Sequence, residues 1–539
     1  MAGLVTTFGS GAMTNSIGEI DNAGTIFVIG SNTTAAHPVI SHRMRRASQN
    51  GATLIVVNPK EIDLVKAADY FVQPKPGSDT AFLMGMCRYI IENDFHDKKF
   101  IEKSTEDFEV FEKSLEPFTE EFVEGITGVP WEQIALIARV YATKKPTSIF
   151  YAMGITQHSH GTDNVKAVAN LAMLTGSIGK PSTGVNPLRG QNNVQGACDL
   201  GGLPNVYPGY QRVDNKENQD KFEKAWGRDL SDKVGLTHTE IFDAILAGDV
   251  KAMYMVGENP VLTEADAKHA RKALEELDFL VSQDIFLTES GQYADVVLPA
   301  ASFAEKDGSF TNTERRVQRV RQVIPPRGDS KPDWWITSQI ARAMEEEGFD
   351  YQSPEDIMDE INQVSPIYGG ITYKRIEDVG LQWPCKDEKD PGTPYLHKGK
   401  FSRGKGKFVP LEYKPSSEIA DKTYPLILTT DRSLYHYHTV MTRKAEGLDE
   451  LDKEELIKMH PSDAEQYGVK DGQWVEISSR RGKVKARAQV TDICQPGLVS
   501  MTFHFVEVPT NEITNPALDP IAKIPETKVS AVKITPITN

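Results

Sequence analysis

The segment 183–203, TGVNPLRGQNNVQGACDLGGL, has the composition of a ligand-binding loop. It holds five glycines, three asparagines and two glutamines, and Arg189 is its one basic residue. Glycine lets the backbone approach a ligand closely, and side-chain amides match heterocycles whose edges both donate and accept hydrogen bonds. The planar guanidinium of Arg189 suits a small carboxylate or a phosphate. These features favour a ligand site over a structural surface loop.

Two H-x-H pairs, His158–His160 and His436–His438, offer a second possible chemistry. If either pair lies on a strand, its two histidines share one face and suit a metal ion. No third ligand can be identified for either pair, so solvated or hydrogen-bonded histidine is the alternative at both. The segment Gly9–Gly11 starts like a dinucleotide-binding glycine loop, but no strand precedes it and no third glycine follows at the required spacing.

Cysteine usage excludes a sequence-local metal cluster. The four cysteines are far apart in the chain, at Cys87, Cys198, Cys385 and Cys494. They form no C-x-x-C pattern, so neither a zinc ribbon nor an iron–sulfur site can be built from neighbouring thiols. A disulfide framework is not expected in so long a chain with so few cysteines. We expect four reduced thiols in a cytoplasmic protein.

The elements that must position these residues alternate between strands and helices in the first half. Expected strands are Thr25–Gly30, Thr53–Val57 and Ser148–Ile155; expected helices are His37–Gln49, Ser78–Ile91 (with Ser78 as N-cap), Trp131–Thr143 and Val165–Leu174. A second set of strands follows at Ala252–Val256, Phe279–Asp284 and Asp295–Leu298. In open α/β sheets, ligands bind beyond the carboxyl ends of the strands, so the site is expected in the loops that follow them.

The last 115 or so residues are rich in expected strands, which predicts a compact barrel. The expected strands are Pro425–Thr430, Gln473–Ser479, Lys483–Val490 and Gly497–Phe503, with a hairpin turn at Arg481-Gly482. The segment between about 326 and 420 has weaker patterns and is expected to connect the domains.

Size and charge exclude several classes of protein. The chain has 539 residues, enough for roughly three or four domains. Its net charge of −16 gives no general reason to bind nucleic acid or an anionic membrane. No apolar run is long enough to span a membrane, and no signal peptide is visible.

Motifs along the whole chain resemble the molybdopterin oxidoreductase superfamily, and within it the catalytic subunit of formate dehydrogenases. The similar segments include GAMTNSIGEIDNAGTIFVIGSN, VVNPK, LTGSIGKPSTGVNPLRGQNNVQGACDLG, YMVGENP, SQDIFLTESGQYADVVLPAASFAEKDGSFTNTERRVQ and YPLILTTDR. The resemblance implies an α/β fold with doubly wound, mostly parallel sheets in two pterin-dinucleotide-binding domains, followed by a β-barrel. The implied domains are 1–191, 192–303 (part of the second), a connecting α+β region at 304–420, and the molybdopterin dinucleotide-binding barrel at 421–539.

The resemblance also implies a set of site residues around two molybdopterin guanine dinucleotides that hold Mo or W. The first dinucleotide would lie along Asn32, Asn58, Lys60, Gly77, Ser78, Asp79, Met153, Gly154 and Gln157, with Gly190 and Gln191 towards the metal. The second would be held by Gly257, Glu258, Thr263, Gln283, Asp284 and Asp333, and the barrel would add Arg432, His436, His438, Phe503, Asn511 and Lys528. Arg189 matches the arginine that orients formate beside the metal, so it is the implied catalytic residue.

The implied reaction interconverts formate and CO2, with electrons leaving through iron–sulfur clusters. Implied partners are iron–sulfur electron-transfer subunits, with a hydrogenase or an NAD-linked flavoprotein as possible acceptors. Another pterin reductase, such as nitrate reductase, and an inactive scaffold subunit are the alternatives.

Two parts of the family pattern have no counterpart in these residues. They are the N-terminal [4Fe–4S] domain and the selenocysteine or cysteine, followed by histidine, that binds the metal. We therefore expect the chain to be inactive alone. We also expect Met1 to be a start codon assigned downstream of an in-frame UGA; a deliberate truncation or a split subunit is the alternative.

Overall fold

The computed structural model describes residues 1–437 and 441–537 and divides the chain into two units. The first unit comprises Met1–Leu188, Leu262–Ala267 and Tyr395–Asn539, and the second comprises Arg189–Val261 and Lys268–Pro394. The domain boundaries at 191, 303 and 420 stay predictions. In the described residues, no helix is both long and apolar enough to cross a membrane.

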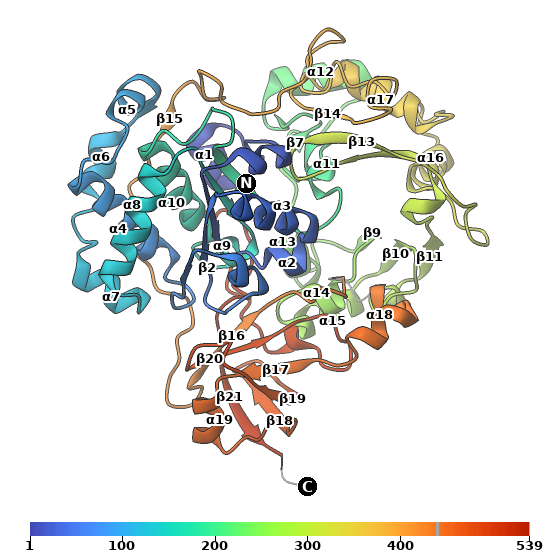
Figure 1. Ribbon diagram of the computed structural model, residues 1–539. Coiled ribbons are helices and arrows are strands. Elements are labelled where there is room, and N and C mark those ends of the chain that lie inside the picture. Colours follow the sequence, from blue (N-terminus) through green and yellow to red (C-terminus); the bar gives the residue numbers. More distant parts are fainter. Residues whose placement is uncertain (438–440, 538–539) are drawn as a thin grey trace. The chain divides into compact units, whose positions relative to one another are not determined.

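The first unit is built on a five-stranded parallel sheet (Figure 1). Its strand order is β3-β2-β1-β5-β6, where β1 is Thr25–Ile29, β2 Thr53–Val57, β3 Tyr70–Val72, β5 Thr147–Tyr151 and β6 Gly184–Pro187. From β1 the chain adds β2 and then β3 on one side of the sheet. It then returns to the other side of β1, where it adds β5 and β6, so the order of addition reverses between β1 and β5. Such a switch point leaves a crevice at the carboxyl ends of the two central strands.

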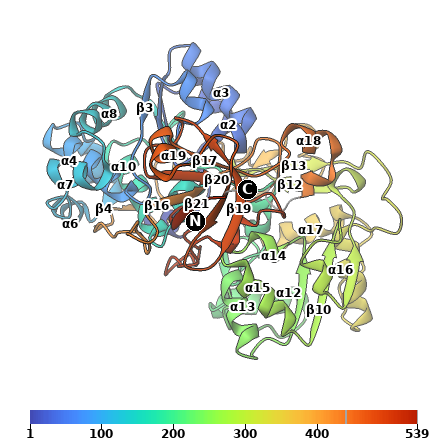
Figure 2. The same cartoon turned by 90° about the horizontal axis from the view of Figure 1, so that it is seen from below.

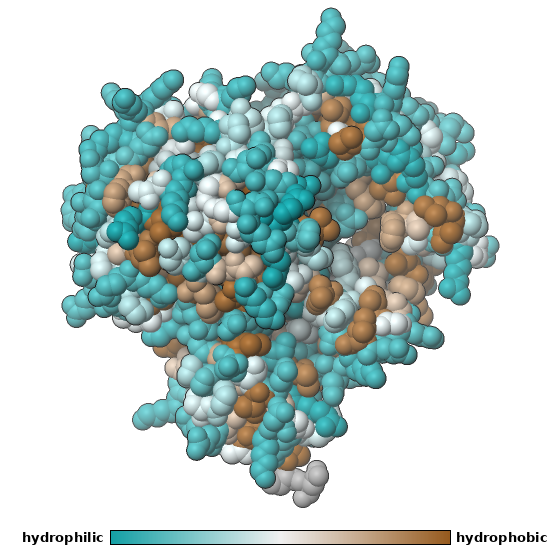
Figure 3. All heavy atoms as spheres, in the orientation of Figure 1, coloured by the Kyte–Doolittle hydropathy of each residue, from teal (hydrophilic) through white to brown (hydrophobic). Residues whose placement is uncertain are grey.

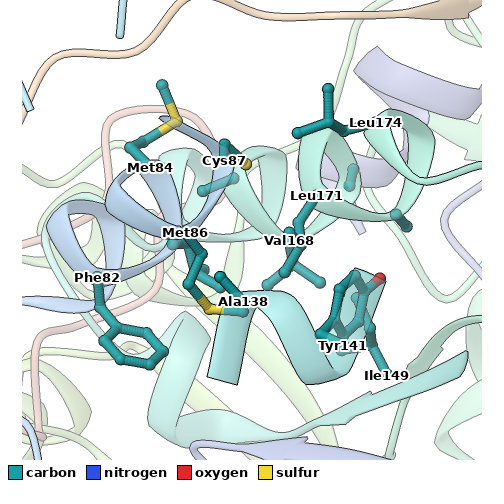
Figure 4. Packing of buried hydrophobic residues seen from close by; sticks show 14 of the residues in the cluster. Phe82, Met84, Met86, Cys87, Ala138, Tyr141, Ile149, Val168, Leu171 and Leu174 are labelled. Atoms are coloured by element: carbon teal, nitrogen blue, oxygen red, sulfur yellow. The ribbon is translucent and has the colours of Figure 1, made fainter. Parts of the chain in front are cut away.

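Helices cover both faces of this sheet because successive side chains of each strand point to opposite faces. Phe27 and Ile29 pack against the helices α4 (Asp79–Glu92), α8 (Trp131–Thr143) and α10 (Gly161–Leu174), in the cluster drawn in Figure 4. Ile26 and Val28 instead pack against α3 (Pro38–Gln49), which Figure 2 shows apart from α4, α8 and α10. The expected doubly wound parallel sheet is therefore confirmed.

The C-terminal part of the first unit is a closed six-stranded barrel. The strands run in the order β16 (Leu426–Thr430), β20 (Leu498–Met501), β17 (Leu456–Met459), β19 (Lys483–Val490), β18 (Trp474–Ser478) and β21 (Ser530–Pro536). In β19 the buried and exposed residues alternate, which is the pattern of a strand with one face in a core. The predicted barrel and its hairpin are confirmed, with Ser479 N–H donating to the Gly482 carbonyl at 2.9 Å.

The second unit contains a three-stranded parallel sheet, β11-β10-β9. Its strands are β9 (Ala252–Val256), β10 (Phe279–Asp284) and β11 (Val296–Pro299). Met255 and Leu280 on one face pack against α13 (His238–Leu246) and α15 (Ala267–Glu275). The opposite face is largely uncovered, and Figure 3 shows apolar side chains on the surface over these strands.

The remaining elements are shorter or lie in the connections. In the first unit they are α1 (Ala2–Phe8), α2 (Thr33–Ala36), α5 (Lys98–Ser104), β4 (Thr105–Glu106), α6 (Phe108–Lys113), α7 (Glu120–Thr127), α9 (Met153–Thr156), β15 (Gly406–Lys407), α18 (Glu446–Leu451) and α19 (Pro461–Tyr467). In the second unit they are α11 (Val194–Asp199), β7 (Val206–Tyr207), β8 (Gln211–Arg212), α12 (Lys216–Trp226), β12 (Gly308–Thr311), β13 (Arg316–Val320), α16 (Asp333–Ala343), α17 (Pro354–Val364) and β14 (Leu381–Gln382), and the short helix α14 (Pro260–Thr263) spans the two units.

Several expected boundaries differ from the structure. The strand expected at Ser148–Ile155 ends at Tyr151, because the chain turns into α9 at Met153. Ser78 occupies the predicted N-cap position of α4, but its side chain makes no capping bond: its hydroxyl donates to the Lys75 carbonyl at 2.6 Å. Helix α10 begins at Gly161, before the expected start at Val165. Strands β17 and β21 were not expected from the sequence.

Candidate functional site

Residues that follow two neighbouring strands of the five-stranded sheet meet a residue that follows a strand of the barrel. Asn32 follows β1, Lys60 follows β2, and both reach Asp431, which follows barrel strand β16. The Asn32 amide donates to the two Asp431 carboxylate oxygens at 3.1 and 3.2 Å, and the Lys60 ammonium forms a close ion pair with the same carboxylate. Asn58 shapes the turn by accepting the Lys60 N–H at 3.1 Å. The sheet edge and the barrel thus build one site.

Positive charge exceeds negative charge among the residues around Asp431. Lys60 also donates to Ser500 Oγ at 3.1 Å, and Lys528 Nζ donates to the Thr430 carbonyl at 2.7 Å. Burial, with Lys60 and Arg432 nearby, lowers the pKa of Lys528 to about 8. An anion placed beside Lys528 would favour its charged form and raise its pKa again.

Burial would raise the pKa of Asp431, but Lys60 and Asn32 hold it well below its usual range. Asp431 is therefore a carboxylate at neutral pH. Of the described charged groups that act on Lys528, Lys60 and Arg432 are cations and Asp431 is an anion. A pyrophosphate, which carries negative charge and many acceptor oxygens, would balance this excess.

A buried arginine donor also fits a bound dinucleotide, and two loops touch at the switch point of the sheet. The Nε of Arg432 is buried and has no hydrogen-bond partner among the described residues, which is the state expected of a donor that awaits a ligand acceptor. The loops after β1 and β5 approach so closely that a Cβ on Gly154 would lie 2.5 Å from the Gly30 carbonyl oxygen. Gly30 itself has φ +58, which favours glycine. A side chain at either glycine would meet the other loop, so the two glycines allow these loops to touch at the switch point of the sheet.

A buried histidine links this edge to the barrel. His158 Nε2 lies 2.8 Å from the Gly154 carbonyl and 3.8 Å from Asp79 Oδ2, and its Nδ1 lies 3.7 Å from Glu526 Oε1. Burial opposes the charged form of His158, but Glu526 and Asp79 together raise its pKa. The His158–His160 pair lies between α9 and α10 and not on a strand, so the shared-face argument for a metal does not apply to it. The described residues contain no group of three or more His, Cys, Asp or Glu side chains arranged to hold a metal.

The other predicted residues of the first unit take up several positions. Gln157 accepts the Lys528 N–H at 3.4 Å, which places Lys528 at the β5 loop. Asn511 donates to the Leu262 carbonyl at 2.7 Å and so lies beside Thr263. His436 is buried, with Nε2 at 2.6 Å from the Asp452 carbonyl. The remaining members are Gly77, in the left-handed region with φ +79, Met153, which is partly exposed, and Phe503, which is buried. His438 lies outside the described residues.

In the second unit, predicted residues again follow parallel strands. Gly257 follows β9, and its N–H donates to the Gln283 carbonyl at 2.8 Å. The Gln283 amide donates to Asp333 Oδ1 at 2.8 Å, at the start of α16. Asp284, the last residue of β10, accepts the Ile285 N–H with its Oδ1 at 2.6 Å. Glu258 follows Gly257 directly, and Gly190 and Gln191 follow Arg189.

Arg189 is held from two sides within the second unit. Its N–H donates to Thr313 Oγ1 at 3.1 Å, and its Nε donates to Gln195 Oε1 at 3.0 Å. Gln195 was not among the predicted site residues, and neither was Asp431. The strand-end rule could have found Asp431, because it directly follows the apolar run LILTT.

Two family models match the chain. Residues 4–343 match the model described as molybdopterin oxidoreductase, and residues 426–531 match the molydopterin dinucleotide binding domain. The first match spans the five-stranded sheet and the second spans most of the barrel.

Individual relatives match over almost the whole chain. The F420-dependent formate dehydrogenase subunit alpha of Methanocaldococcus jannaschii is 48% identical over 538 residues, which is 99% of this chain and 80% of that protein. Formate dehydrogenase H of Escherichia coli is 40% identical over 550 residues, covering 100% of this chain and 76% of that protein. The solved structure of acetylene hydratase from Pelobacter acetylenicus shares the fold, with a TM-score of 0.78 at 19% identity over 100% of this chain and 80% of that one. The chain therefore belongs to the molybdopterin oxidoreductase family.

Proposed function

We propose that this chain forms the larger part of a formate dehydrogenase, or CO2 reductase, catalytic subunit that holds two molybdopterin guanine dinucleotides with Mo or W. The family and the relatives named as formate dehydrogenases support the reaction. The observation that carries the cofactor assignment is the buried excess of positive charge around Asp431, at the switch point of a parallel sheet.

Residues of the first unit would hold one dinucleotide. Lys60, Arg432 and Lys528 would supply the charge that a pyrophosphate needs. Asn32, Asn58 and the segment Gly77–Asp79 would line the guanosine part. In the second unit, the loops after β9 and β10, with Asp333 at the start of α16, would hold the other dinucleotide.

Arg189 would bind the carboxylate of formate. A guanidinium forms two parallel hydrogen bonds with a carboxylate, which orients the C–H bond away from the arginine. When bound, the pterin-held metal supplies the two-electron chemistry that converting formate into CO2 and a proton requires. Iron–sulfur subunits would carry the two electrons to a hydrogenase, an NAD-linked flavoprotein or another acceptor.

The test compares two lysine variants in the complete holoenzyme with its partner subunits. Lys60→Ala removes a buried cation at the site, whereas Lys66→Ala removes an exposed lysine whose partner is the half-exposed Asp63. We expect the unmodified enzyme to release two GMP per subunit on acid hydrolysis of the bound cofactor and to reduce a viologen dye with formate. Lys60→Ala should lower pterin content by roughly tenfold, because it removes a charge-assisted contact, and Lys66→Ala should leave it unchanged.

Two results would overturn the proposal. One is a loaded holoenzyme that reduces nitrate with viologen but does not oxidise formate. The other is an unmodified subunit, prepared with its partners, that contains neither pterin nor metal, which would favour a scaffold role.

A further inference from the structure

Helix α11 carries two buried polar residues one turn apart, Gln195 and Asp199. Their side chains are 1% and 0% exposed. Residues four apart lie on the same face of a helix, and here the Gln195 Nε2 donates to Asp199 Oδ1 at 2.7 Å. The helix start is itself held in place, because Asn193 Oδ1 accepts the Thr311 N–H at 2.9 Å. Both side chains are therefore carried on an anchored backbone.

Asp199 receives hydrogen bonds from four side chains that come from four segments of the second unit. Besides Gln195, the donors are Tyr210 Oη to Oδ1 at 2.7 Å, and Tyr368 Oη and Trp383 Nε1 to Oδ2 at 2.8 and 2.6 Å. An ionised carboxylate has about four acceptor positions, so these donors satisfy it completely. The carboxylate cannot rotate without losing several bonds at once.

Tyr210 reaches Asp199 from a strained backbone. Its φ is +61, in the left-handed region that bulky residues avoid. Such a conformation persists where the surroundings hold it, and it is concentrated at functional sites. The Tyr210 hydroxyl also accepts a hydrogen bond from Gln195 Nε2 at 2.9 Å, so Tyr210 and Asp199 together hold the Gln195 amide nitrogen.

This arrangement fixes the direction of the Gln195 amide. Both N–H groups of Gln195 point to acceptors, Asp199 and Tyr210, so its carbonyl oxygen must point the other way. That oxygen accepts the Nε–H of Arg189 at 3.0 Å. If the amide were reversed, N–H groups would face the guanidinium and repel it. Holding Nε sets the plane of the guanidinium, and that plane decides how its terminal nitrogens meet a carboxylate.

We propose that Asp199 and Gln195 are positioning residues: through Gln195, the buried Asp199 carboxylate sets the guanidinium of Arg189, and thereby the affinity for the substrate carboxylate. Neither residue touches the substrate. The inference rests on the proposed function, because it presupposes that Arg189 binds formate.

The first experiment measures formate binding in holoenzyme variants. Gln195→Met keeps the length of the side chain but removes the acceptor for Arg189, and Asp199→Asn keeps the shape but removes the charge that orients Gln195. Each variant should raise the KM for formate roughly tenfold, the cost of one hydrogen bond to a charged group, with kcat changed less than about threefold. Added formate should also raise the Tm of the variants less than that of the unmodified enzyme.

Gln382→Met is the matched control. Gln382 is also buried, donates to the Glu314 carbonyl at 2.8 Å and accepts from an arginine, Arg316, at 3.1 Å. A purely structural role for Gln195 predicts that both glutamine variants lower Tm alike and that neither changes the formate KM selectively. Tyr210→Phe is a milder second variant, which should raise KM in the same direction while leaving Asp199 three of its four donors.

A double variant separates this inference from the proposed function. In the Arg189→Lys background, Gln195→Met should raise KM no further, because lysine has no Nε–H for Gln195 to hold. If Arg189→Lys leaves KM and kcat unchanged, the proposed role of Arg189 is wrong. If Arg189→Lys raises KM but Gln195→Met and Asp199→Asn act no more than Gln382→Met, the positioning role is wrong and the proposed function stands.

Discussion

At the scale of single residues, the buried pair of His158 and Glu526 joins the first sheet to the barrel. Glu526 also accepts hydrogen bonds from Ser417 N–H at 2.9 Å and from Asn515 Nδ2 at 3.1 Å. Burial would raise the pKa of Glu526, but His158 and Ser417 lower it to about 2. The unfolded chain holds the glutamate near its usual pKa of 4.5. The folded state therefore binds this proton less readily than the unfolded state does.

This difference predicts how stability depends on pH. The contribution of Glu526 is complete above pH 4.5 and is lost as the pH falls towards 2, amounting to about 3 kcal/mol. Glu526→Gln should lower the free energy of unfolding by that order at pH 7, and its urea unfolding curves should converge with the unmodified protein's only as the pH falls to about 2. The exposed Glu102→Gln serves as control. A constant difference across this pH range would contradict the role of Glu526.

At the scale of elements, the close approach of the loops after β1 and β5 defines the switch point. Gly154 N–H donates to the Gly30 carbonyl at 3.0 Å, which leaves no space for a side chain between the two loops. The contact links a strand end to the start of α9, so it holds two elements that the chain separates by more than a hundred residues. Both positions require glycine because a Cβ at either one would lie within 3 Å of the other loop's backbone.

Gly154→Ala should force these loops apart. The new Cβ would meet backbone atoms, which cannot move aside like a flexible side chain, so we expect a loss of about 1–3 kcal/mol in the free energy of unfolding. Gly125→Ala in α7 is the matched control, since nothing lies within 4 Å of its Cβ. Helix propensity predicts a gain of up to about 1 kcal/mol there. Urea titration of both variants measures the difference. If Gly154→Ala and Gly125→Ala had equal free energies of unfolding, the two loops would be able to separate at little cost.

At the scale of the whole molecule, the uncovered face of the β9–β11 sheet is the feature that stands out. Val256, Phe279 and Val296 are 45%, 44% and 38% exposed, although parallel sheets normally have both faces covered. At its far end, Gln283 contacts Asp333 of α16. An apolar surface of this kind favours association with other polypeptide surfaces.

We therefore expect the purified 539-residue chain to self-associate and to bind the dye ANS. The double variant Val256→Thr/Val296→Thr keeps the β-branched shape on this face and adds hydroxyls, so it should lower both signals. Val110→Thr, at a single exposed valine of α6, should change neither. Light scattering and ANS fluorescence measure the two effects. A monomeric chain that binds no ANS would show that this face does not drive association.

Local patterns in the sequence predicted many of the elements. Thr53–Val57 and Lys483–Val490 were predicted with the bounds they have, because both signals are local: the first is an apolar run ended by Asn58-Pro59, and the second alternates polar and apolar residues after Gly482. The sheet rule predicted a site in the loops after the strands; Asn32 and Lys60, which the resemblance implied, lie in such loops and both contact Asp431, and ligand binding there stays a prediction.

Only the tertiary structure decided which charges and donors come together. Asp431 lies 371 residues from Lys60 in the chain, and Glu526 lies 367 residues from Ser159 beside His158. The donors to Asp199 include Tyr368 and Trp383, which are 169 and 184 residues away. Contacts over such separations leave no periodic pattern in the sequence, because they depend on how finished elements pack. Strands β17 and β21 were missed for the same reason. They pair with β19 and β18, which lie in other segments of the barrel.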